Sequence, residues 1–468
     1  PIGSSGKSGG QGSITLSTVT LGGTSRGSHT TNFAEDLTML FLEAEEDVML
    51  REDMAFRIYG NISDALLMKA CNLAKLVKGK IKFVSDETVI AQQLNEGRPI
   101  DVARDYALTG CFLHTVPGIT HDPGGDFFCL PMMLELALNN GVCRYNNKRF
   151  GPETGDPRKF NTYEDVWNAY TEQIRALLPV SISGQNLTFK LSGEMLPSPL
   201  MSALYDGCIE SGRDVVNCGG KYNSVSLWVS GIPSVADSLA ALKKTVFEDH
   251  VLTMDEVITA IENDFVGYEN VQKILSSAPK YGNDIDYVDY IVNDVISFMA
   301  DEIKQYKAPY GRQWTCAGAA ITSNVSLGRV VAAMPDGRKA GEPYSEGGMS
   351  PFQGRNVSGV TSTLVSAAKV NLTKATGGSV VNLKINPDGM NDKMKMWKFA
   401  NLLRTACQMG LDIVQFNFIS NEVLREAQAH PENYRDLLVR VATYSAYFVG
   451  LPLDVQNEII SRTEFEGI

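Results

Sequence analysis

Apolar residues recur every three to four positions in several long stretches of the chain, the spacing that puts them on one face of an α-helix. Asn32 and Glu35 resemble a capping box at the start of the first stretch. Its apolar positions are Leu37, Leu40, Phe41, Ala44 and Val48. The same pattern predicts further helices over residues 234–248, 284–305 and 395–409.

Short runs of β-branched and aromatic residues lie between these stretches. They cover residues 380–385, 413–418 and 437–441. Short, mainly apolar runs of this kind are typical of strands in a parallel sheet. Strands that alternate with helices over hundreds of residues indicate an α/β fold, in which functional residues usually lie on loops at the strand ends.

The composition is that of a folded globular protein. Of the 468 residues, 44% are hydrophobic and 21% are charged, and the formal net charge is -12. This charge, with Lys and Arg scattered along the chain, argues against nucleic acid or an anionic membrane as the main partner. No run approaches the ~18 consecutive apolar residues that a membrane-spanning helix needs.

The eight cysteines show no C-x-x-C spacing, so the sequence predicts reduced thiols in a cytoplasmic protein rather than a zinc or iron–sulfur site. The amino-terminal Gly6-Lys7-Ser8 matches the end of a phosphate-binding loop. The glycine that should precede it and the helix that should follow are missing, which favours a flexible loop. Because the chain opens at Pro1 with this glycine-rich run, we interpret it as part of a longer protein.

Two segments have the composition of functional loops. The first, residues 108–118, contains Cys111 directly after Gly110, with a Pro-Gly pair downstream, which indicates a constrained turn. The second, residues 440–448, places small and polar residues around Thr443 in an otherwise apolar setting. These two loops are the candidate sites of chemistry.

The second loop, Arg-Val-Ala-Thr-Tyr-Ser, resembles the signature of the glycyl radical enzymes, the pyruvate formate-lyase type of radical catalyst. The first loop resembles the cysteine loop of that family. Further matching segments occur in the expected order. They are Leu134–Gly141, Gly151–Asp156, Ala236–Lys243, Met334–Pro343 and Gln415–Asn417. The resemblance covers nearly all of the chain and corresponds to the carboxy-terminal half of the family.

The resemblance implies a ten-stranded α/β barrel made of two half-sheets, with the cysteine and glycine loops meeting inside. It divides the chain into a barrel part, residues 1–420, and a glycine radical domain, residues 421–468. It also implies an anaerobic cytoplasmic enzyme that binds no cofactor directly. Its partners are then an S-adenosylmethionine and iron–sulfur activating enzyme, which installs the radical, a second copy in a homodimer, small accessory subunits and a small-molecule substrate.

In that family Cys111 is the catalytic hydrogen-atom relay, and Thr443 stands where the radical glycine belongs. A threonine Cα carries one hydrogen, and the branched side chain resists the planar radical and the backbone freedom of glycine. We therefore expect this chain to be inactive as written. A natural inactive relative and a deliberate replacement of the glycine both fit the sequence.

The residues after Cys111 bear on the substrate. Many family members have a glutamate two positions after the cysteine, whereas Leu113 can neither donate nor accept a proton. Together with Phe112, Leu113 favours carbon–carbon bond chemistry on an apolar or aromatic substrate or a small organic acid, including addition to fumarate. We take Phe112, Leu113 and His114 as candidate substrate-binding residues, with Phe127 and Phe128 nearby. An aryl-acid decarboxylase that uses His114 or His121 as proton donor fits as well.

A dicarboxylate co-substrate would require a cation, best an arginine. Arg104, Arg144 and Arg149 are nearest to the cysteine loop in sequence, while Arg338 is expected to anchor a turn. The competing hypothesis is a non-catalytic paralogue that binds an activating enzyme or partner subunit without turnover. A hydrolase or dehydrogenase is not favoured, because no G-x-S-x-G elbow and no G-x-G-x-x-G turn stands between a strand and a helix.

Overall fold

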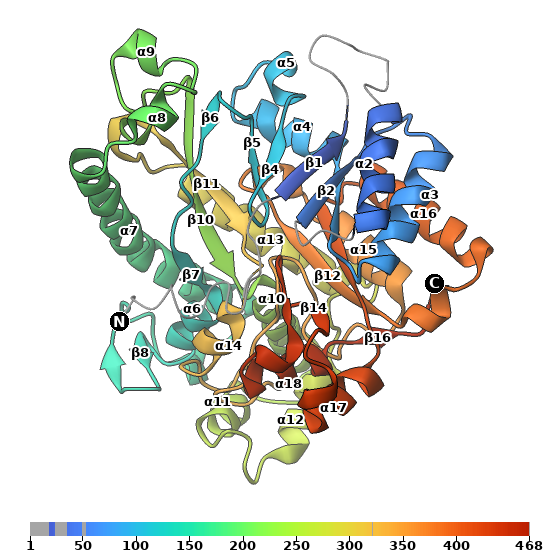
Figure 1. Ribbon diagram of the computed structural model, residues 1–468. Coiled ribbons are helices and arrows are strands. Elements are labelled where there is room, and N and C mark those ends of the chain that lie inside the picture. The colour runs from blue at the N-terminus through green and yellow to red at the C-terminus, as the bar shows by residue number, and fades with distance from the viewer. Residues whose placement is uncertain (1–17, 24–34, 49–52, 321, 468) are drawn as a thin grey trace.

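The computed structural model describes residues 18–23, 35–48, 53–320 and 322–467 (Figure 1). Asn32 and the Gly6-Lys7-Ser8 run lie outside the described residues. The strands are β1 Thr18–Gly22, β2 Asp53–Ile58, β3 Ile81–Ser85, β4 Ala107–Thr109, β5 Leu113–Thr115, β6 Thr120–His121, β7 Phe127–Cys129, β8 Val142–Cys143, β9 Lys148–Arg149, β10 Tyr222–Ser230, β11 Gln313–Gly318, β12 Val380–Ile385, β13 Ile413–Phe418, β14 Leu438–Arg440, β15 Ser445–Tyr447 and β16 Glu464–Phe465.

The α-helices surround these strands. They are α2 Glu35–Val48, α3 Asp64–Leu76, α4 Asp86–Asn95, α5 Ile100–Ala103, α6 Leu130–Ala137, α7 Tyr163–Met195, α8 Pro199–Ser202, α9 Cys208–Ser211, α10 Ile232–Leu242, α11 Met254–Glu262, α12 Glu269–Ser277, α13 Asp286–Ile303, α14 Ser323–Gly328, α15 Val360–Ala368, α16 Lys393–Gln408, α17 Asn421–Ala429 and α18 Leu453–Ser461. A π-helical turn, Lys243–Glu248, extends α10.

Ten of these strands form the two sheets of an α/β barrel, and β4–β5, β8–β9 and β14–β15 are separate hairpins. Six strands pair in the order β1-β2-β3-β13-β12-β16, and β11, β10, β6 and β7 make a four-stranded sheet. Within the first sheet, β1 to β3 are parallel to one another and meet β13 in antiparallel orientation. A bridge between Gly318 and Ser379 joins the end of β11 to the start of β12. Two groups of parallel strands running in opposite directions therefore build the barrel wall.

Side chains of the barrel strands alternate between two environments, because successive residues of a strand point to opposite faces. On β2, β3 and β13 the outward positions are large and apolar, and they pack with the surrounding helices in one core cluster. These residues are Met54, Phe56, Ile58, Ile81, Phe83, Val414, Phe416 and Phe418. The inward positions carry Ala55, Val84 and Ile413, which belong to a second cluster with the cysteine loop.

Polar and charged residues share that inward face. They include Asp53, Arg57, Lys82, Gln415 and Asn417, all buried. Burying charged groups costs free energy unless partners compensate for the lost water, so these residues are expected to form a connected network. The barrel interior thus combines apolar and polar side chains, whereas the outer face of these strands is apolar.

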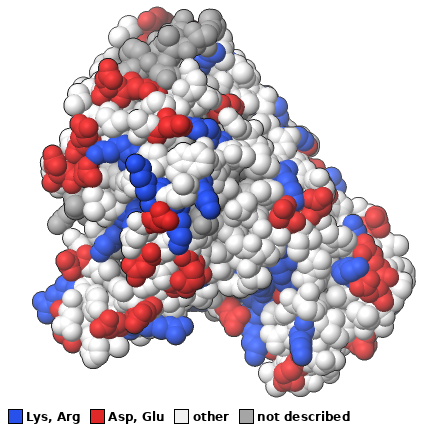
Figure 2. Space-filling model, turned by 90° about the vertical axis from the view of Figure 1, so that its right-hand side faces the viewer, with Lys and Arg blue, Asp and Glu red and all other residues white. Residues whose placement is uncertain are grey.

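Helices cover the outside of both sheets. In Figure 1, α3 and α16 stand beside the six-stranded sheet, with α2 next to α3, while α6 and α7 lie by the four-stranded sheet. Helix α13 contacts α10 and β11. Acidic and basic side chains are interspersed on the face that Figure 2 shows, with no broad area of one sign.

Most predicted elements are present, with shifted ends. The predicted strands 380–385 and 413–418 are confirmed as β12 and β13, and the helices expected over 284–305 and 395–409 as α13 and α16. The helix expected from Ser234 begins two residues earlier, after Gly231 in a left-handed conformation. Helix α2 is present, but its buried side chains are Thr38, Leu42 and Glu45, so most of the apolar stripe inferred from spacing is exposed.

Residues 437–441 contain the predicted strand, β14, but the prediction that it belongs to the parallel sheet was wrong. Strand β14 pairs antiparallel with β15, in a two-stranded hairpin of its own. Its apolar residues Val439 and Val441 pack in a third cluster with helices α17 and α18. The run is apolar because it contacts this carboxy-terminal cluster, which periodicity cannot distinguish from the interior of a sheet.

Candidate functional site

Cys111 lies in the turn of the β4–β5 hairpin, where Thr109 pairs with Leu113. The preceding Gly110 has φ +60°, and no atom lies within 4 Å of the position where a Cβ would be. Glycine is favoured there for its backbone conformation, since most other residues avoid this left-handed region. The hairpin packs against the inner apolar cluster of the barrel, and Cys111 itself is partly exposed.

Thr443 lies in the turn of the β14–β15 hairpin and is 1% exposed. Thr443 is not among the described residues with a positive φ. The threonine therefore fits the turn without backbone strain. Its hydroxyl donates a hydrogen bond of 3.0 Å to the carbonyl of Ala320. The side chain that replaces glycine is therefore well accommodated.

Three successive backbone carbonyls of this turn accept hydrogen bonds from buried or part-buried side chains. Arg462 donates to the carbonyl of Val441, Gln415 to that of Ala442, and Arg440 to that of Thr443 over 2.7 Å. Arg440 also donates to the Gln415 side-chain oxygen over 3.1 and 3.2 Å. The backbone on both sides of residue 443 is thus held in place.

The two turns are linked by a chain of buried charges. Arg440 forms an ion pair of 2.6 Å with Asp53, and Asp53 lies 3.5 Å from the ammonium of Lys82. Lys82 then donates a hydrogen bond of 2.9 Å to the carbonyl of Gly110, whose carbon is bonded to the amide nitrogen of Cys111. The path from the Thr443 carbonyl to the cysteine turn therefore runs through three side chains.

The pKa of Lys82 is lowered to about 8, first by burial and then by the nearby Arg440 cation, against the opposing effect of Asp53 and Cys111. Burial also raises the pKa of Tyr444, beside Thr443, to about 12, and Cys111 is among the groups that add to this shift. Both shifts arise because a low-dielectric interior disfavours the charge that each group would gain or keep.

The candidate substrate-binding residues have different surroundings. The Phe112 ring is buried and meets the Trp228 ring edge to face at 5.8 Å, and Leu113 is half-buried at the edge of the same cluster. His114 is buried, with its Nε2 3.3 Å from a carboxylate oxygen of Asp412. Their role in substrate binding stays a prediction, as does that of Cys111 and Thr443 in catalysis.

Both candidate proton donors are uncharged near neutral pH. Burial, assisted by Arg98, lowers the pKa of His114 to about 3, and burial with Arg312 lowers that of His121 to about 4. The partner of His114, Asp412, has its pKa raised to about 7 by burial. An imidazole in such surroundings can accept a proton only at a high cost in free energy.

Two of the three arginines nearest to Cys111 in sequence pair with carboxylates outside the cysteine turn. Arg144 and Arg149 belong to the β8–β9 hairpin region and pair with Glu262 and Glu153. The predicted turn anchor, Arg338, is confirmed: it is 1% exposed and donates to the carbonyls of Gly328, Val331, Ala332, Glu342 and Pro343.

Sequence reasoning missed Lys82 and Asp53, and it named Gln415 only as part of a matching segment without a role in the site. The signal was available for Lys82 and Gln415, which stand between apolar residues in short strand-like runs, whereas Asp53 follows Glu52 at the start of such a run. A polar residue at alternate positions of a buried strand indicates a polar interior on that face.

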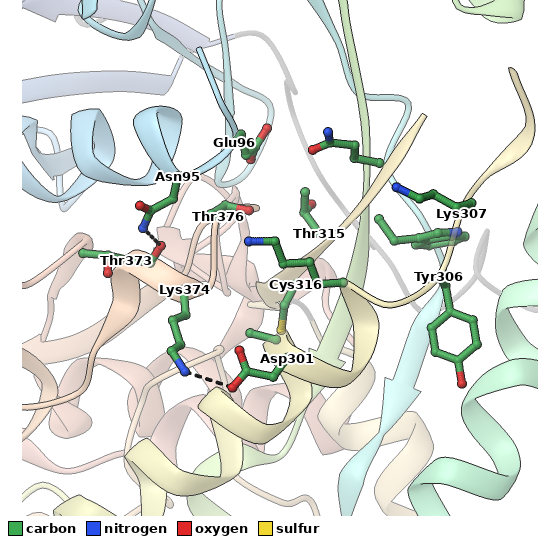
Figure 3. A pocket seen from close by; sticks show the side chains of 14 residues that line it. Asn95, Glu96, Asp301, Tyr306, Lys307, Thr315, Cys316, Thr373, Lys374 and Thr376 are labelled. Carbon is green, nitrogen blue, oxygen red and sulfur yellow. Dashed lines mark hydrogen bonds and ion pairs between the residues drawn. The ribbon is translucent and has the colours of Figure 1, made fainter. Parts of the chain in front are cut away.

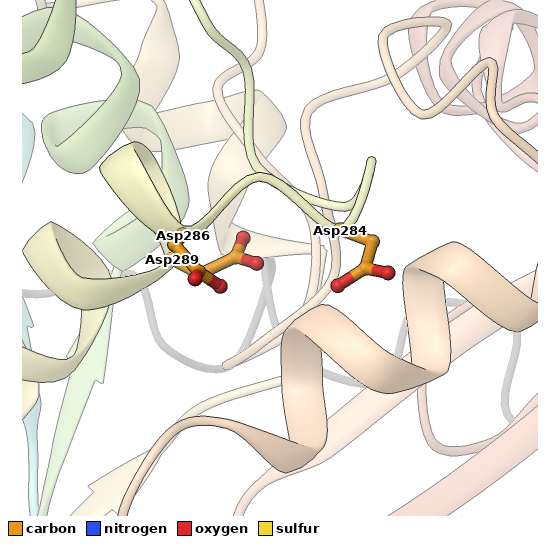
Figure 4. Close-up of side chains that lie close together, drawn as sticks. All are labelled: Asp284, Asp286 and Asp289. Carbon is orange, nitrogen blue, oxygen red and sulfur yellow. The ribbon is translucent and has the colours of Figure 1, made fainter.

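Two other features of the described residues lie apart from these turns. A pocket of about 350 Å³ is lined by residues including Glu96, Thr315 and Lys374, and Figure 3 shows Lys374 paired with Asp301 at 2.9 Å. The carboxylates of Asp284, Asp286 and Asp289 form the acidic group in Figure 4. The ammonium of Lys369 lies 2.5, 2.6 and 3.2 Å from them and offsets part of their negative charge.

The chain belongs to the pyruvate formate lyase-like family. The model of that family, pyruvate formate lyase-like, matches residues 4–328, and the glycine radical model matches residues 345–449. The isethionate sulfite-lyase of Desulfovibrio desulfuricans is 35% identical over 96% of this chain and 54% of its own length. The indoleacetate decarboxylase of Tractidigestivibacter scatoligenes is 32% identical over 87% of this chain and 49% of its own.

Solved structures give the same family. The glycerol-bound B12-independent glycerol dehydratase from Clostridium butyricum superimposes with a TM-score of 0.93 at 31% identity, over 96% of this chain and 57% of its own. A glycyl radical enzyme from Archaeoglobus fulgidus gives 0.91 at 30% identity, over 98% and 58%. The predicted glycyl radical enzyme barrel is thereby confirmed, and the chain spans about half the length of the relatives it matches.

Among the described residues, none of the helices combines the length and the apolar character that crossing a bilayer requires.

Proposed function

We propose that this chain carries the two catalytic loops of a glycyl radical enzyme, with Cys111 as the hydrogen-atom relay and residue 443 as the radical position. The observation that carries the proposal is the chain of contacts from the Thr443 carbonyl through Arg440, Asp53 and Lys82 to the Gly110 carbonyl. It fixes the two turns relative to each other, and reacting groups that are held in place react faster.

The proposed chemistry transfers one hydrogen atom at a time. With a radical on the Cα of residue 443, the S–H bond of Cys111 breaks and its hydrogen atom forms a C–H bond at that Cα. The sulfur is left as a thiyl radical, which then takes a hydrogen atom from the substrate or adds to it. The protein contributes position and a dry cavity, and Cys111 needs no lowered pKa for this role.

The proposal makes the chain inactive as written, because Thr443 cannot form the planar, glycine-like radical. A glycine at 443 would be activated by an S-adenosylmethionine and iron–sulfur enzyme, in an anaerobic cytoplasm. A homodimer with small accessory subunits, and a division into residues 1–420 and 421–468, are parts of the same proposal. The carboxy-terminal cluster formed mainly by residues 419–459 supports a separate unit near that end.

For the reaction we propose carbon–carbon bond chemistry on a small organic acid or an apolar or aromatic substrate. Leu113 supports this, since it offers no acid or base, and so does the ring of Phe112 packed on Trp228. The names of the relatives include a sulfite-lyase, dehydratases and a decarboxylase. Addition to fumarate and decarboxylation of an aryl acid are specific forms of this chemistry, and the lowered pKa values of His114 and His121 weigh against either as the proton donor of a decarboxylase.

A non-catalytic paralogue is the second candidate. The observation that favours it is the Thr443 hydroxyl, which donates to the Ala320 carbonyl in a fully buried turn. A buried, hydrogen-bonded threonine is consistent with a turn that binds a partner rather than one that carries a radical.

Anaerobic electron paramagnetic resonance distinguishes the radical enzyme from the non-catalytic paralogue. The Thr443→Gly variant is incubated with activating enzyme and S-adenosylmethionine, beside the unchanged chain. A doublet split by the Cα hydrogen in the variant alone supports the radical enzyme. Silence from both, with the activating enzyme competent on a control substrate, supports the paralogue.

A further inference from the structure

Two buried cations beside the cysteine turn share a single carboxylate. Arg440 and Lys82 both pair with Asp53, at 2.6 and 3.5 Å. The side chains of all three are 4% exposed or less. Counted together, they leave one positive charge without a counter-charge in the barrel interior.

The other buried cations are held in different ways. Lys384 of β12 donates to the side chain of Asn421 and to the carbonyls of Ile459 and Ile460, whereas Arg57 and Arg98 have carboxylate partners of their own. Arg57 forms two hydrogen bonds with Asp86, at 2.7 and 3.2 Å, and Arg98 pairs with Glu96. Lys82 differs from these two arginines because its nearer partner is the neutral carbonyl of Gly110. The excess charge therefore falls on the ammonium next to Cys111.

Because of where Lys82 lies, its charge acts on any molecule that binds near the Cys111 thiol. Lys82 is held on β3, with its neighbours Ile81 and Phe83 fixed in the outer core, so its side chain cannot turn away from the interior. It binds the carbonyl one peptide unit before Cys111. Because water is excluded there, the field of the ammonium is only weakly screened.

We propose that Lys82 makes the Cys111 site selective for molecules that carry an anionic group, a carboxylate or a sulfonate. An anion beside the thiol would neutralise the excess charge, whereas a neutral molecule of the same shape would leave it buried and unpaired. The proposal deepens the proposed function by naming the substrate class, and it rests on Cys111 being the reacting residue.

Alkylation of Cys111 tests the selectivity without any radical. The unchanged 468-residue chain is treated with iodoacetate, which is anionic, and separately with iodoacetamide, which is neutral. Mass spectrometry of the Cys111 peptide gives both rates. In each reaction the sulfur displaces iodide, so the ratio of the two rates removes differences in thiol reactivity and reports the charge preference alone.

We expect Lys82→Met to lower the iodoacetate-to-iodoacetamide ratio by about tenfold, the size expected for one poorly screened charge several ångströms away. Lys82→Arg should retain the ratio. Lys80→Met is the matched control, since Lys80 is also buried and lies two residues away, paired with Glu45. A ratio that stays within twofold in a folded Lys82→Met chain overturns the proposal.

If the Lys82→Met variant does not fold, the Asp53→Asn variant tests the anion selectivity of the Cys111 site instead. It removes the shared carboxylate and leaves both cations, so the ratio should rise at least severalfold, and no change overturns the proposal. Because both experiments use the chain with Thr443, their outcome is independent of the electron paramagnetic resonance result. A silent radical experiment with an intact charge preference would reject the radical enzyme and keep the anion site.

Discussion

The two hairpin turns that Lys82, Asp53 and Arg440 connect are held in different ways. In the turn at residue 443, three consecutive carbonyls accept hydrogen bonds from side chains, and the residue itself is 1% exposed. In the cysteine turn, the carbonyl of Gly110 accepts from Lys82 and from the hydroxyl of Thr18, and Cys111 is partly exposed. The turn at residue 443 is held at three carbonyls and is closed to solvent. The cysteine turn is held at one carbonyl, and the Cys111 side chain is partly exposed.

This difference suits the roles proposed for them. A position that stores a reactive centre benefits from a rigid backbone without solvent, whereas a relay must meet both that centre and a substrate. The network on the inner face is shared between them, so substitutions can be chosen that disturb both turns or only one.

Asp53→Ala should have the largest effect, because it leaves Arg440 and Lys82 buried without their carboxylate. We expect the free energy of unfolding to fall by about 3–5 kcal/mol, measured by urea denaturation. Hydrogen exchange should speed up at the amides of both turns. The control is Asp64→Ala, whose carboxylate is 72% exposed and pairs with Arg404, and for which a loss below about 1 kcal/mol is expected. Equal losses in the two variants would contradict the shared role of Asp53.

The pH dependence of stability should identify Lys82. A lysine in the unfolded chain titrates near 10.5, and the folded chain lowers the pKa of Lys82 to about 8. Between these values the unfolded chain holds a proton that the folded chain has lost. The free energy of unfolding should therefore rise with pH across this window, by about 3 kcal/mol.

Denaturation series from pH 8 to 10.5 on the unchanged chain and on Lys82→Met measure this contribution. The charged and titratable groups that act on Lys82 are Asp53, Arg440 and Cys111. The rise should be lost in Lys82→Met and kept in Lys80→Met. Parallel curves for all three chains would show that the ammonium is not the source.

Gln415→Leu should loosen the turn at residue 443 and leave the cysteine turn unchanged. It removes the donor to the Ala442 carbonyl and to the Asn382 side chain and an acceptor of Arg440, so three polar groups lose a partner. We expect a loss of about 2 kcal/mol and faster hydrogen exchange confined to residues 440–445. Gln305→Leu, at an exposed position near the end of α13, should change stability by less than about 0.5 kcal/mol. Faster exchange at Cys111 as well would mean that the turns do not move independently.

Gly110→Ala should give the smallest effect and act on the cysteine turn alone. The φ of +60° disfavours a side chain, although nothing lies within 4 Å to collide with it, so the expected loss is about 1 kcal/mol. The opposite sign is expected for Gly184→Ala in helix α7, which should stabilise by about 0.5–1 kcal/mol. Thermal denaturation of the two variants side by side tests both signs, and a large loss for Gly110→Ala would reveal a contact that its surroundings do not indicate.

The order of the motifs and the spacing of apolar residues predicted the α/β barrel, its family and several elements. Strands β12 and β13 could be predicted to the residue because both of their faces are buried and their ends are sharp. Residues 437–441 have a similar composition but form a hairpin strand, since apolar runs also arise where a turn packs on helices.

The site was predictable only in part. Cys111 and Thr443 stood out through local sequence. The charged residues that link them are far apart in the chain, because Asp53 lies 29 residues before Lys82 and 387 residues before Arg440. Arg440 was visible as part of a motif, but its partner Asp53 could be found only by asking which strand positions face inward. The exposed stripe of α2 shows the same limit, because spacing gives a helical face but does not say what covers it.

The hydrogen bonds from side chains to the carbonyls of Val441, Ala442 and Thr443 determine how often this turn can open. For any enzyme to reach the Cα of this residue, the turn must leave the interior and give up the hydrogen bonds of Arg462, Gln415 and Arg440. At about 1.5 kcal/mol for each of these bonds, the open form would be roughly one molecule in 2,000. Access to residue 443 is therefore a rare event governed by the fold, and a partner that captures the open turn controls how often chemistry there can begin.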